Sequence, residues 1–419
     1  MSKITFLAIG SRGDVNPACI LGQSLKDVGY QVCIATHDRF RDFVLGSGLE
    51  FAPIAGDYKQ LLNSEAGLNT LEGKGSLRLI SDELLYQQIE DSLSACRGSD
   101  LIIGFPLSLF GYHIAEFLNV RFLAMSYLPI VATKDFPFLQ FGASKSGWLQ
   151  QLNPLSYKLA ELLLWNSDRQ VINSFRQKFG LTKIPFLGVA YRRDKPANLA
   201  EIPIIHYFSS IVVPRPLDWS ESAHITGYLQ PKKTEYQPHA KLSDFLNQGD
   251  QPIYIGFGSM ALRESVAVTK IIIEALKQIN LRAILLSGWA NLGQVDLPDN
   301  IYLLEEYVPF DWLFPRLKAV VHHGGSGTVA LGLHAGIPQV VIPFFADQPG
   351  WGKRLEMLGV APPPIAIKNL DTEKLLTSLT IATRDTELRQ KAQAIASRLQ
   401  QENGVAQAVA VIQNFLEPA

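Results

Sequence analysis

The chain has 419 residues, of which 47% are hydrophobic and 18% are charged, and its formal net charge at pH 7 is −1. This length allows two domains, each with a sizeable core. A net charge so close to zero argues against nucleic acid as the main partner.

The N-terminal half alternates predicted strands with predicted helices. Short apolar runs indicate buried strands, and apolar residues at intervals of three and four indicate helices. The predicted strands are Ile4–Gly10, Gln31–Thr36, Leu49–Pro53, Leu101–Phe105 and Phe122–Ser126. The predicted helices are Pro17–Gly29, His37–Gly46, Arg78–Cys96, Leu109–Leu118 and Leu155–Phe179. This alternation is typical of a doubly wound parallel sheet.

Two stretches of this half show no clear period. Tyr58–Lys74 is interpreted as a variable loop with helical pieces, and Phe136–Trp148 concentrates aromatic residues. An aromatic loop beside a cleft would suit an apolar ligand, and ordinary core packing explains the same composition equally well.

Prolines interrupt the pattern ahead of a second alternation. We place the domain junction in Pro231–Lys241, which divides the chain into residues 1–235 and 236–419. Predicted strands follow at Pro252–Gly256, Arg282–Ser287, Ile301–Leu304, Lys318–Val321 and Val340–Phe345. Predicted helices follow at Ser265–Ile279, Trp312–Arg316, Thr328–Ala335, Thr372–Thr383, Glu387–Glu402 and Gly404–Leu416. We expect two Rossmann-like domains that face a central cleft, with the last helix packing back on the first domain.

The sequence also bears on location. Three cysteines without metal-ligand spacing are expected to be buried thiols in a reducing compartment. The N-terminal apolar run is too short for a signal peptide. The longest stretch without Asp, Glu, Lys or Arg, Ala319–Ala346, contains histidines, glycines and prolines that make a poor membrane span. We expect a cytoplasmic protein, and peripheral contact with a membrane is compatible with the sequence.

A Gly-Ser-rich turn is the most informative stretch of the chain. It runs from His322 to Thr328, between a predicted strand and a predicted helix. Free N–H groups and the positive dipole end at such a helix start form an anion site, so the turn predicts a phosphate or diphosphate ligand. Asp347 and Gln348 follow the next strand, at the sheet edge where ligands of open α/β folds bind.

Two further loops follow strands. Gly256–Ala261 matches G-x-G-x-x-A, but the next strand ends without the acidic residue of a dinucleotide site, so Ser259 is expected to face the same diphosphate instead. In the loop Gly10–Pro17, Asp14 is placed just before a helix. A helix cap and a general base both explain an aspartate there. His37, His113 and His334 are each interpreted as structural, because none has an evident partner.

Six segments resemble the family-1 glycosyltransferases of the GT-B fold, and in particular the sterol glucosyltransferases and the glycosyltransferases of glycopeptide-antibiotic biosynthesis. They are Gly10–Pro17, Ala35–Val44, Pro216–Leu229, Pro252–Met260, Asp311–Thr328 and Pro343–Gln348. The resemblance implies an inverting, metal-independent transfer of a sugar from a nucleoside diphosphate to a hydroxyl. It implies that the C-terminal domain holds the donor, with UDP-glucose expected, and that the N-terminal domain holds an apolar acceptor.

The resemblance also implies residue roles. His323 matches the histidine that contacts the diphosphate, and Asp14 falls where many relatives carry a catalytic histidine. Plant relatives hold the donor ribose with a glutamate where this chain has Leu331, and they stack a tryptophan on uracil where it offers Tyr307 or Phe310. The expected donor-binding residues are Ser11, Arg12, Ser259, Trp289, Tyr307, Val308, His323, Gly325, Ser326, Gly327, Thr328, Asp347 and Gln348.

No metal and no cofactor besides the nucleotide sugar are expected. Two alternatives remain open: a nucleotide-sugar epimerase or hydrolase of the same fold, and a non-catalytic protein that binds nucleotide sugar or lipid. The intact pair of Asp14 and His323 argues against the second.

Overall fold

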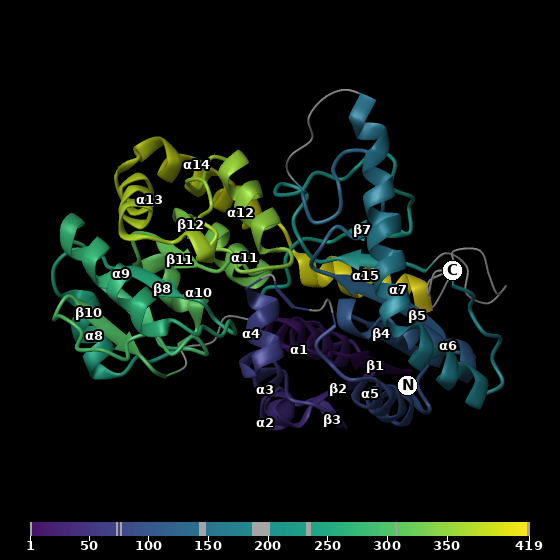
Figure 1. The fold of residues 1–419 in the computed structure, drawn as a ribbon. Helices are drawn as coiled ribbons and strands as arrows, with labels where there is room; N and C mark the ends of the chain where they lie inside the picture. The colour runs from purple at the N-terminus through teal and green to yellow at the C-terminus, as the bar shows by residue number, and fades with distance from the viewer. Residues whose placement is uncertain are drawn as a thin grey trace.

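The computed structural model describes residues 2–72, 74–75, 78–141, 148–186, 202–231, 236–306 and 308–416. These residues form two α/β domains, each built on a parallel sheet, which confirms the expected fold class (Figure 1). The described part of the N-terminal domain has a seven-stranded sheet in the order β3-β2-β1-β4-β5-β6-β7. The described part of the C-terminal domain has a five-stranded sheet in the order β10-β9-β8-β11-β12.

The N-terminal sheet is built from short strands separated by helices. Its strands are β1 (Lys3–Leu7), β2 (Gln31–His37), β3 (Glu50–Ile54), β4 (Leu101–Gly104), β5 (Arg121–Ser126), β6 (Ile204–His206) and β7 (Ala223–Ile225). Its helices are α1 (Arg12–Asp27), α2 (Arg41–Gly46), α3 (Tyr58–Asn63), α4 (Glu65–Leu71), α5 (Asp82–Cys96), α6 (Gly111–Leu118) and α7 (Asn153–Lys178).

The C-terminal sheet repeats this plan on a smaller scale. Its strands are β8 (Ile253–Gly256), β9 (Ala283–Leu286), β10 (Ile301–Leu304), β11 (Val320–His322) and β12 (Gln339–Val341). Its helices are α8 (Ala240–Asn247), α9 (Ser265–Ile279), α10 (Phe310–Leu313), α11 (Ser326–Ala335), α12 (Gln348–Met357), α13 (Thr372–Arg384) and α14 (Thr386–Leu399), followed by α15 (Gly404–Leu416).

Strand order fixes where ligands can bind. In each sheet the first strand of the domain lies beside its fourth strand, β1 beside β4 and β8 beside β11, and the winding direction reverses between them. Ligands of doubly wound sheets bind at the carboxyl ends of the strands at this switch point. The loops after β1, β8 and β11, which the sequence singled out, all start there.

The structure differs from the predicted elements in specific places. Helix α1 begins at Arg12 rather than Pro17, because Ser11 caps it and Asp14 completes a capping box. Strands β6 and β7 have three residues each, too few to show a period, and neither was predicted. Helices α8 and α12 were not predicted either. Tyr58–Lys74, expected as a loop with helical pieces, contains α3 and α4.

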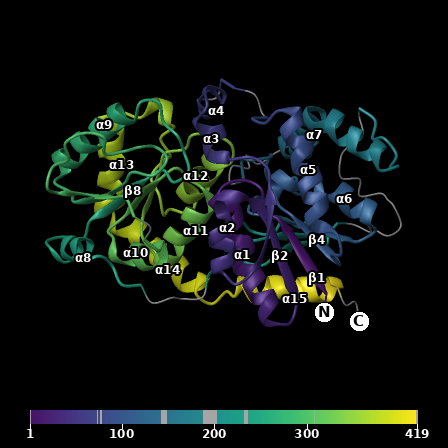
Figure 2. The ribbon, with the colours of Figure 1, turned by 90° about the horizontal axis from the view of Figure 1, so that it is seen from below.

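The last helix returns to the first domain. The buried side chains of α15, Ala408, Val409 and Ile412, belong to the same core cluster as α1, on one face of the N-terminal sheet (Figure 2). The Arg121 side chain donates a hydrogen bond to the Phe415 carbonyl at 2.6 Å. The chain therefore crosses between the domains a second time before α15.

The two crossing segments touch each other. A Cβ added at Gly404 would lie 2.4 Å from the carbonyl oxygen of Tyr228 and 2.6 Å from that of Gly227. Only a residue without a side chain fits this approach, so Gly404 allows the outgoing and returning segments to run side by side.

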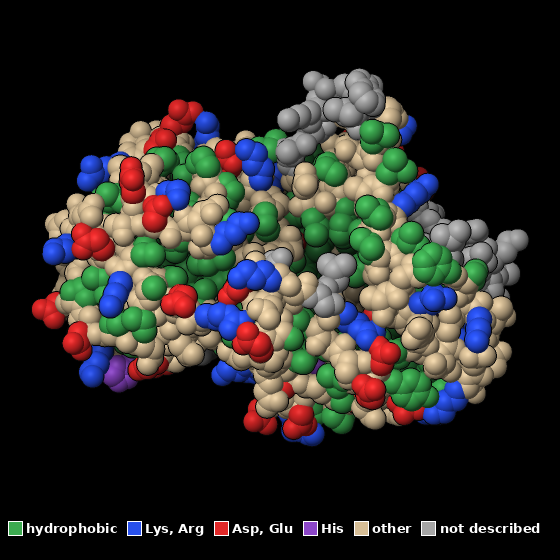
Figure 3. Space-filling model, in the orientation of Figure 1, with side chains coloured by type: hydrophobic (Ala, Val, Ile, Leu, Met, Phe, Trp, Pro, Cys, Tyr) green, Lys and Arg blue, Asp and Glu red, His purple; other side chains and the backbone are tan. Residues whose placement is uncertain are grey.

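Apolar contacts also join the domains. The ring of Phe141 packs on Trp351 of α12 with centroids 4.6 Å apart, and both side chains are almost fully buried. The molecular surface is hollowed between the two domains (Figure 3). Within the described residues, every helix is either too short or too polar to cross a membrane.

Candidate active site

The loop after β1 is held by hydrogen bonds from both sides. The backbone N–H and the hydroxyl of Ser11 donate to Oδ2 of Asp14 at 2.8 Å and 3.2 Å. His37 accepts the Gly10 N–H at 3.3 Å, and its other ring nitrogen lies 3.2 Å from the carbonyl oxygen of Ile54. Gly10 has a φ of +136°, and a Cβ there would lie 2.3 Å from Asp14 Oδ2. The side chain of His37, interpreted as structural, thus supports the turn that carries Asp14.

Asp14 lies in the first turn of α1, not before it as the sequence predicted. Its side chain is buried, and burial raises its pKa to about 6, although the hydrogen bonds from Ser11 oppose the rise. Both hydrogen bonds from Ser11 go to Oδ2, the oxygen that serves the cap. One carboxylate can therefore cap the helix and also accept a proton.

The turn after β11 is anchored by a neutral histidine. His322 is fully buried, and burial lowers its pKa to about 3. One ring nitrogen lies 2.9 Å from Oε1 of Gln339, and the other accepts the Gly324 N–H at 3.1 Å. The acceptor role toward Gly324 requires the neutral ring, so this histidine fixes the start of the turn rather than facing a ligand.

His323 lies between two glycine-containing loops. A Cβ at Gly258, after β8, would lie 3.1 Å from its Cε1, and a Cβ at Gly325 would lie 2.4 Å from its Nε2. Burial lowers the pKa of His323 to about 4, so the ring is neutral at pH 7. Its Nδ1 is buried and has no hydrogen-bond partner among the described residues.

The first backbone N–H groups of helix α11 are not capped by a side chain. It begins at Ser326, and its N-cap residue, Gly325, supplies no side-chain cap. The hydroxyls of Ser259, Ser326 and Thr328 make no hydrogen bonds with the described residues. Uncapped N–H groups, free hydroxyls and a neutral histidine at one corner can bind an oxyanion.

The loop before α12 combines strain with burial. Ala346 has a left-handed φ of +55°, which costs free energy for a residue with a side chain. Burial, with a smaller contribution from the charge of Asp14, raises the pKa of the neighbouring Asp347 to about 7. Oε1 of Gln348 accepts the N–H groups of Phe344 at 2.8 Å and Phe345 at 3.3 Å.

The remaining predicted donor-binding residues lie in different settings. The guanidinium of Arg39, from the N-terminal domain, lies 5.0 Å from the ring centre of Trp289. The Val308 side chain is buried in the C-terminal core and is closed to a ligand. Arg12 is exposed, with its guanidinium 4.7 Å from the Phe43 ring centre. Tyr307 lies outside the described residues.

The two domains bring Asp14 and Asp347 within electrostatic range of each other. Burial raises the pKa of Tyr127, which follows β5, and of Tyr207, which follows β6, and the charges of both carboxylates add to the rise. The centroids of these two tyrosine rings are 6.2 Å apart. Sequence reasoning missed both tyrosines. Tyr127 directly follows the predicted strand Phe122–Ser126, which was a usable signal, whereas Tyr207 follows β6, which was not predicted. Among the described residues, no three His, Cys, Asp or Glu side chains are grouped to hold a metal ion.

Two family models match this chain. The N-terminal domain of glycosyltransferase family 28 matches residues 4–137, and the C-terminal domain of erythromycin biosynthesis protein CIII-like proteins matches residues 270–411. Together they cover the loop that carries Asp14 and the turn that carries His323.

Curated relatives match along almost the whole chain. Sterol 3-beta-glucosyltransferase UGT80A2 of Arabidopsis thaliana is 36% identical over 97% of this chain, and UGT80B1 of the same plant is 35% identical over 99%. A sterol 3-beta-glucosyltransferase of Debaryomyces hansenii is 33% identical over 100%. The alignments span 64%, 68% and 27% of these three relatives, so all three are longer than this chain.

Solved structures share the fold. The glycotransferase of kitacinnamycin superposes with a TM-score of 0.73 at 16% identity, and the alignment covers 99% of both chains. Glycosyltransferase VinC, in complex with DTDP, superposes with a TM-score of 0.66 at 18% identity, over the full length of both chains. With the sequence identity to the plant relatives, this shows that the chain belongs to the family-1 glycosyltransferases of the GT-B fold, in the group that includes the sterol 3-beta-glucosyltransferases.

Proposed function

We propose that the protein transfers a hexose, with glucose expected, from a UDP-sugar to the hydroxyl of a sterol or a similarly apolar alcohol. The observation that carries this proposal is the juxtaposition of Asp14, from one domain, and Asp347, beside the anion site of the other. A base on one side of the interface and a sugar-binding carboxylate on the other are what a two-substrate transfer requires.

On the acceptor side, Asp14 is the proposed general base. A pKa raised to about 6 brings this carboxyl nearer to the working pH than an ordinary aspartate, which favours general-base catalysis. The pKa of an alcohol is far higher, so proton transfer to Asp14 is concerted with attack of the acceptor oxygen on the anomeric carbon. Attack from the face opposite the leaving diphosphate inverts the anomeric configuration.

On the donor side, His323 and the start of α11 stabilise the leaving diphosphate. The neutral ring can donate one N–H to a phosphate oxygen, and the first N–H groups of α11 and the hydroxyls of Ser259, Ser326 and Thr328 supply further donors. This set of donors can offset the developing charge without a metal. Asp347 and Gln348 are the proposed contacts to the sugar hydroxyls.

A stripe on α7 supports contact with a membrane surface. Leu155, Leu159 and Leu163 are 49–58% exposed and follow one another at intervals of four, so they lie on one helix face. A bilayer is also where a sterol acceptor resides. Leu159→Glu with Leu163→Glu should reduce sedimentation with sterol-containing vesicles, and unchanged sedimentation would reject this contact.

One experiment separates the proposal from its rivals. UDP-glucose consumption is followed with and without a sterol, before and after addition of a chelator. Sterol-dependent consumption that survives the chelator, with a β-linked product by NMR, supports inverting transfer without a metal. Consumption without sterol favours an epimerase or hydrolase, and binding without consumption favours a non-catalytic protein. Loss of activity that Mg²⁺ restores would contradict the metal-free mechanism.

A further inference from the structure

Helices α3 and α4 form an arm of the N-terminal domain that packs on the C-terminal domain. Leu62 and Leu71, on this arm, are only 4% and 3% exposed. They belong to the same core cluster as Phe257, Met260 and Ala261, which lie in the loop after β8. The arm therefore contributes to the core of the other domain, next to the loop that carries Ser259.

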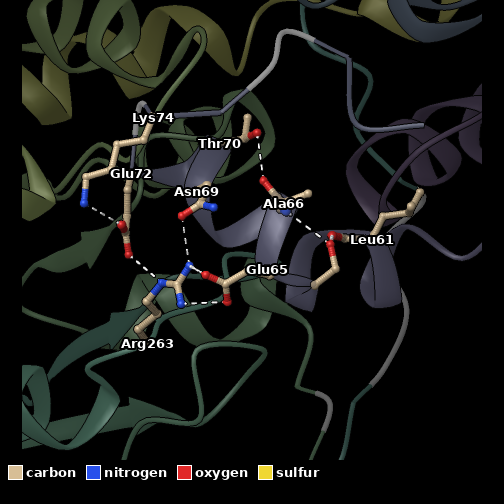
Figure 4. Close-up of polar contacts among 10 residues, drawn as sticks. Leu61, Glu65, Ala66, Asn69, Thr70, Glu72, Lys74 and Arg263 are labelled. Atoms are coloured by element: carbon tan, nitrogen blue, oxygen red, sulfur yellow. Dashed lines mark hydrogen bonds and ion pairs between the residues drawn. The ribbon is translucent and has the colours of Figure 1, made fainter. Parts of the chain in front are cut away.

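One arginine ties the arm to this loop. The Arg263 guanidinium donates to both carboxylate oxygens of Glu65, at 2.7 Å and 2.9 Å (Figure 4). Its Nε donates to Glu72 at 2.9 Å, and Nη2 also donates to Asn69 at 3.0 Å. The three partners are spaced four and three residues apart, so they lie on one side of the arm. Every nitrogen of the guanidinium has a partner in the opposite domain.

The geometry of the Arg263 ion pairs indicates that they position the two domains rather than stabilise the fold. Glu65 is 75% exposed and Glu72 is 36% exposed, and ion pairs in water contribute little to folding stability. A planar guanidinium with a bidentate partner does impose direction. Arg263 lies four residues after Ser259, and the arm begins at Tyr58, whose pKa is raised by burial and by the charge of Asp14. The contacts of Arg263 with Glu65, Asn69 and Glu72, here called the clamp, therefore link the surroundings of Asp14 to the loop that carries Ser259.

We infer that Arg263 is a positioning residue for sugar transfer. It clamps the arm of the acceptor domain onto the loop after β8 and so sets the distance between the general base and the bound donor. This inference rests on the proposed function. It assigns Arg263 no contact with either substrate.

The test compares Arg263→Ala and Arg263→Lys with Lys391→Ala as a matched control. Lys391 forms an ion pair with Glu387 at 2.6 Å, within one helix of the C-terminal domain. Arg263→Ala should lower kcat/KM for the acceptor by about 10- to 100-fold, because misplacement by about 1 Å costs that much. Affinity for UDP, measured by calorimetry, should stay near wild type. Arg263→Lys keeps the charge but loses the planar, forked guanidinium, so its kcat/KM should lie between the values of Arg263→Ala and the wild type.

A structural readout separates this inference from the proposed function. Small-angle scattering should give a larger radius of gyration for Arg263→Ala than for the wild type and for Lys391→Ala. High salt should expand the wild type but not the variant, because exposed ion pairs are screened. If the radius of gyration increases as expected but the wild type transfers no sugar, Arg263 does hold the two domains together and the proposed function is wrong. Kinetics and scattering equal to those of Lys391→Ala, or a kinetic loss explained by unfolding, would overturn the inference.

Discussion

The ring of His323 occupies the space that a side chain at Gly325 would need, with Nε2 only 2.4 Å from a Cβ built there. Since Gly325 is the N-cap of α11, the histidine and the helix start are fitted to each other. The His323 ring can therefore take this position only because residue 325 is a glycine.

Gly325→Ala should displace the His323 ring and weaken donor binding. Gly327→Ala is the comparison, because a Cβ there meets nothing within 4 Å. Calorimetry with UDP should show a larger loss of affinity for Gly325→Ala than for Gly327→Ala. Equal affinities in the two variants would mean that the position of His323 does not matter for the nucleotide.

Asp14→Asn separates the two roles of this residue. Asparagine caps a helix about as well as aspartate, and the raised pKa of Asp14 means that its charge does not stabilise the fold, so the melting temperature should not fall below that of the wild type. It cannot accept a proton at neutral pH, so kcat should fall by about 10²–10⁴. Ser11→Ala, which removes the capping hydroxyl, should instead lower the free energy of unfolding by about 1 kcal/mol. Normal turnover of the Asn variant would leave Asp14 with the cap alone.

The pH profile should report the same carboxyl group. A base must be deprotonated to act, and burial raises the pKa of Asp14 to about 6. The value of kcat/KM should therefore fall about tenfold per pH unit as the pH drops below about 6. The Asn variant should lose this acidic limb. A limb near pH 4 in the wild type would contradict the raised pKa.

Asp347→Asn should stabilise the protein while it impairs transfer. The folded-state pKa of Asp347, about 7, is above the unfolded value of about 3.9. Its contribution to stability is therefore complete below about pH 4 and is lost as the pH rises through 7. Denaturant unfolding at pH 8 should favour the variant by roughly 1–4 kcal/mol, and the difference should vanish near pH 4. An equal difference at both pH values would exclude titration of Asp347 as the cause.

The sequence predicted the features that depend on neighbouring residues, and it did not predict those that depend on residues far apart in the chain. Apolar runs and glycine turns predicted β1, β8 and β11 because their information lies within a few residues. The contact of Arg263 with Glu65 joins residues 198 positions apart, and no local period encodes it. The burial of Val308 also depends on neighbours from distant elements. The sequence predicted Asp14 as either a cap or a base, because the residue type alone does not show which hydrogen bonds its carboxylate oxygens accept.

The two chain crossings beside Gly404 determine how the domains can move. Because the segments run in contact, we expect them to act as one hinge, with relative motion mainly a rotation about an axis through them. Helix α4 lies on the opposite side of the molecule from the start of α15 (Figure 2). A small rotation at the hinge therefore becomes a much larger displacement at Arg263. An opening of about 1 Å is enough to break the hydrogen bonds of Arg263, because these bonds weaken steeply beyond their normal length.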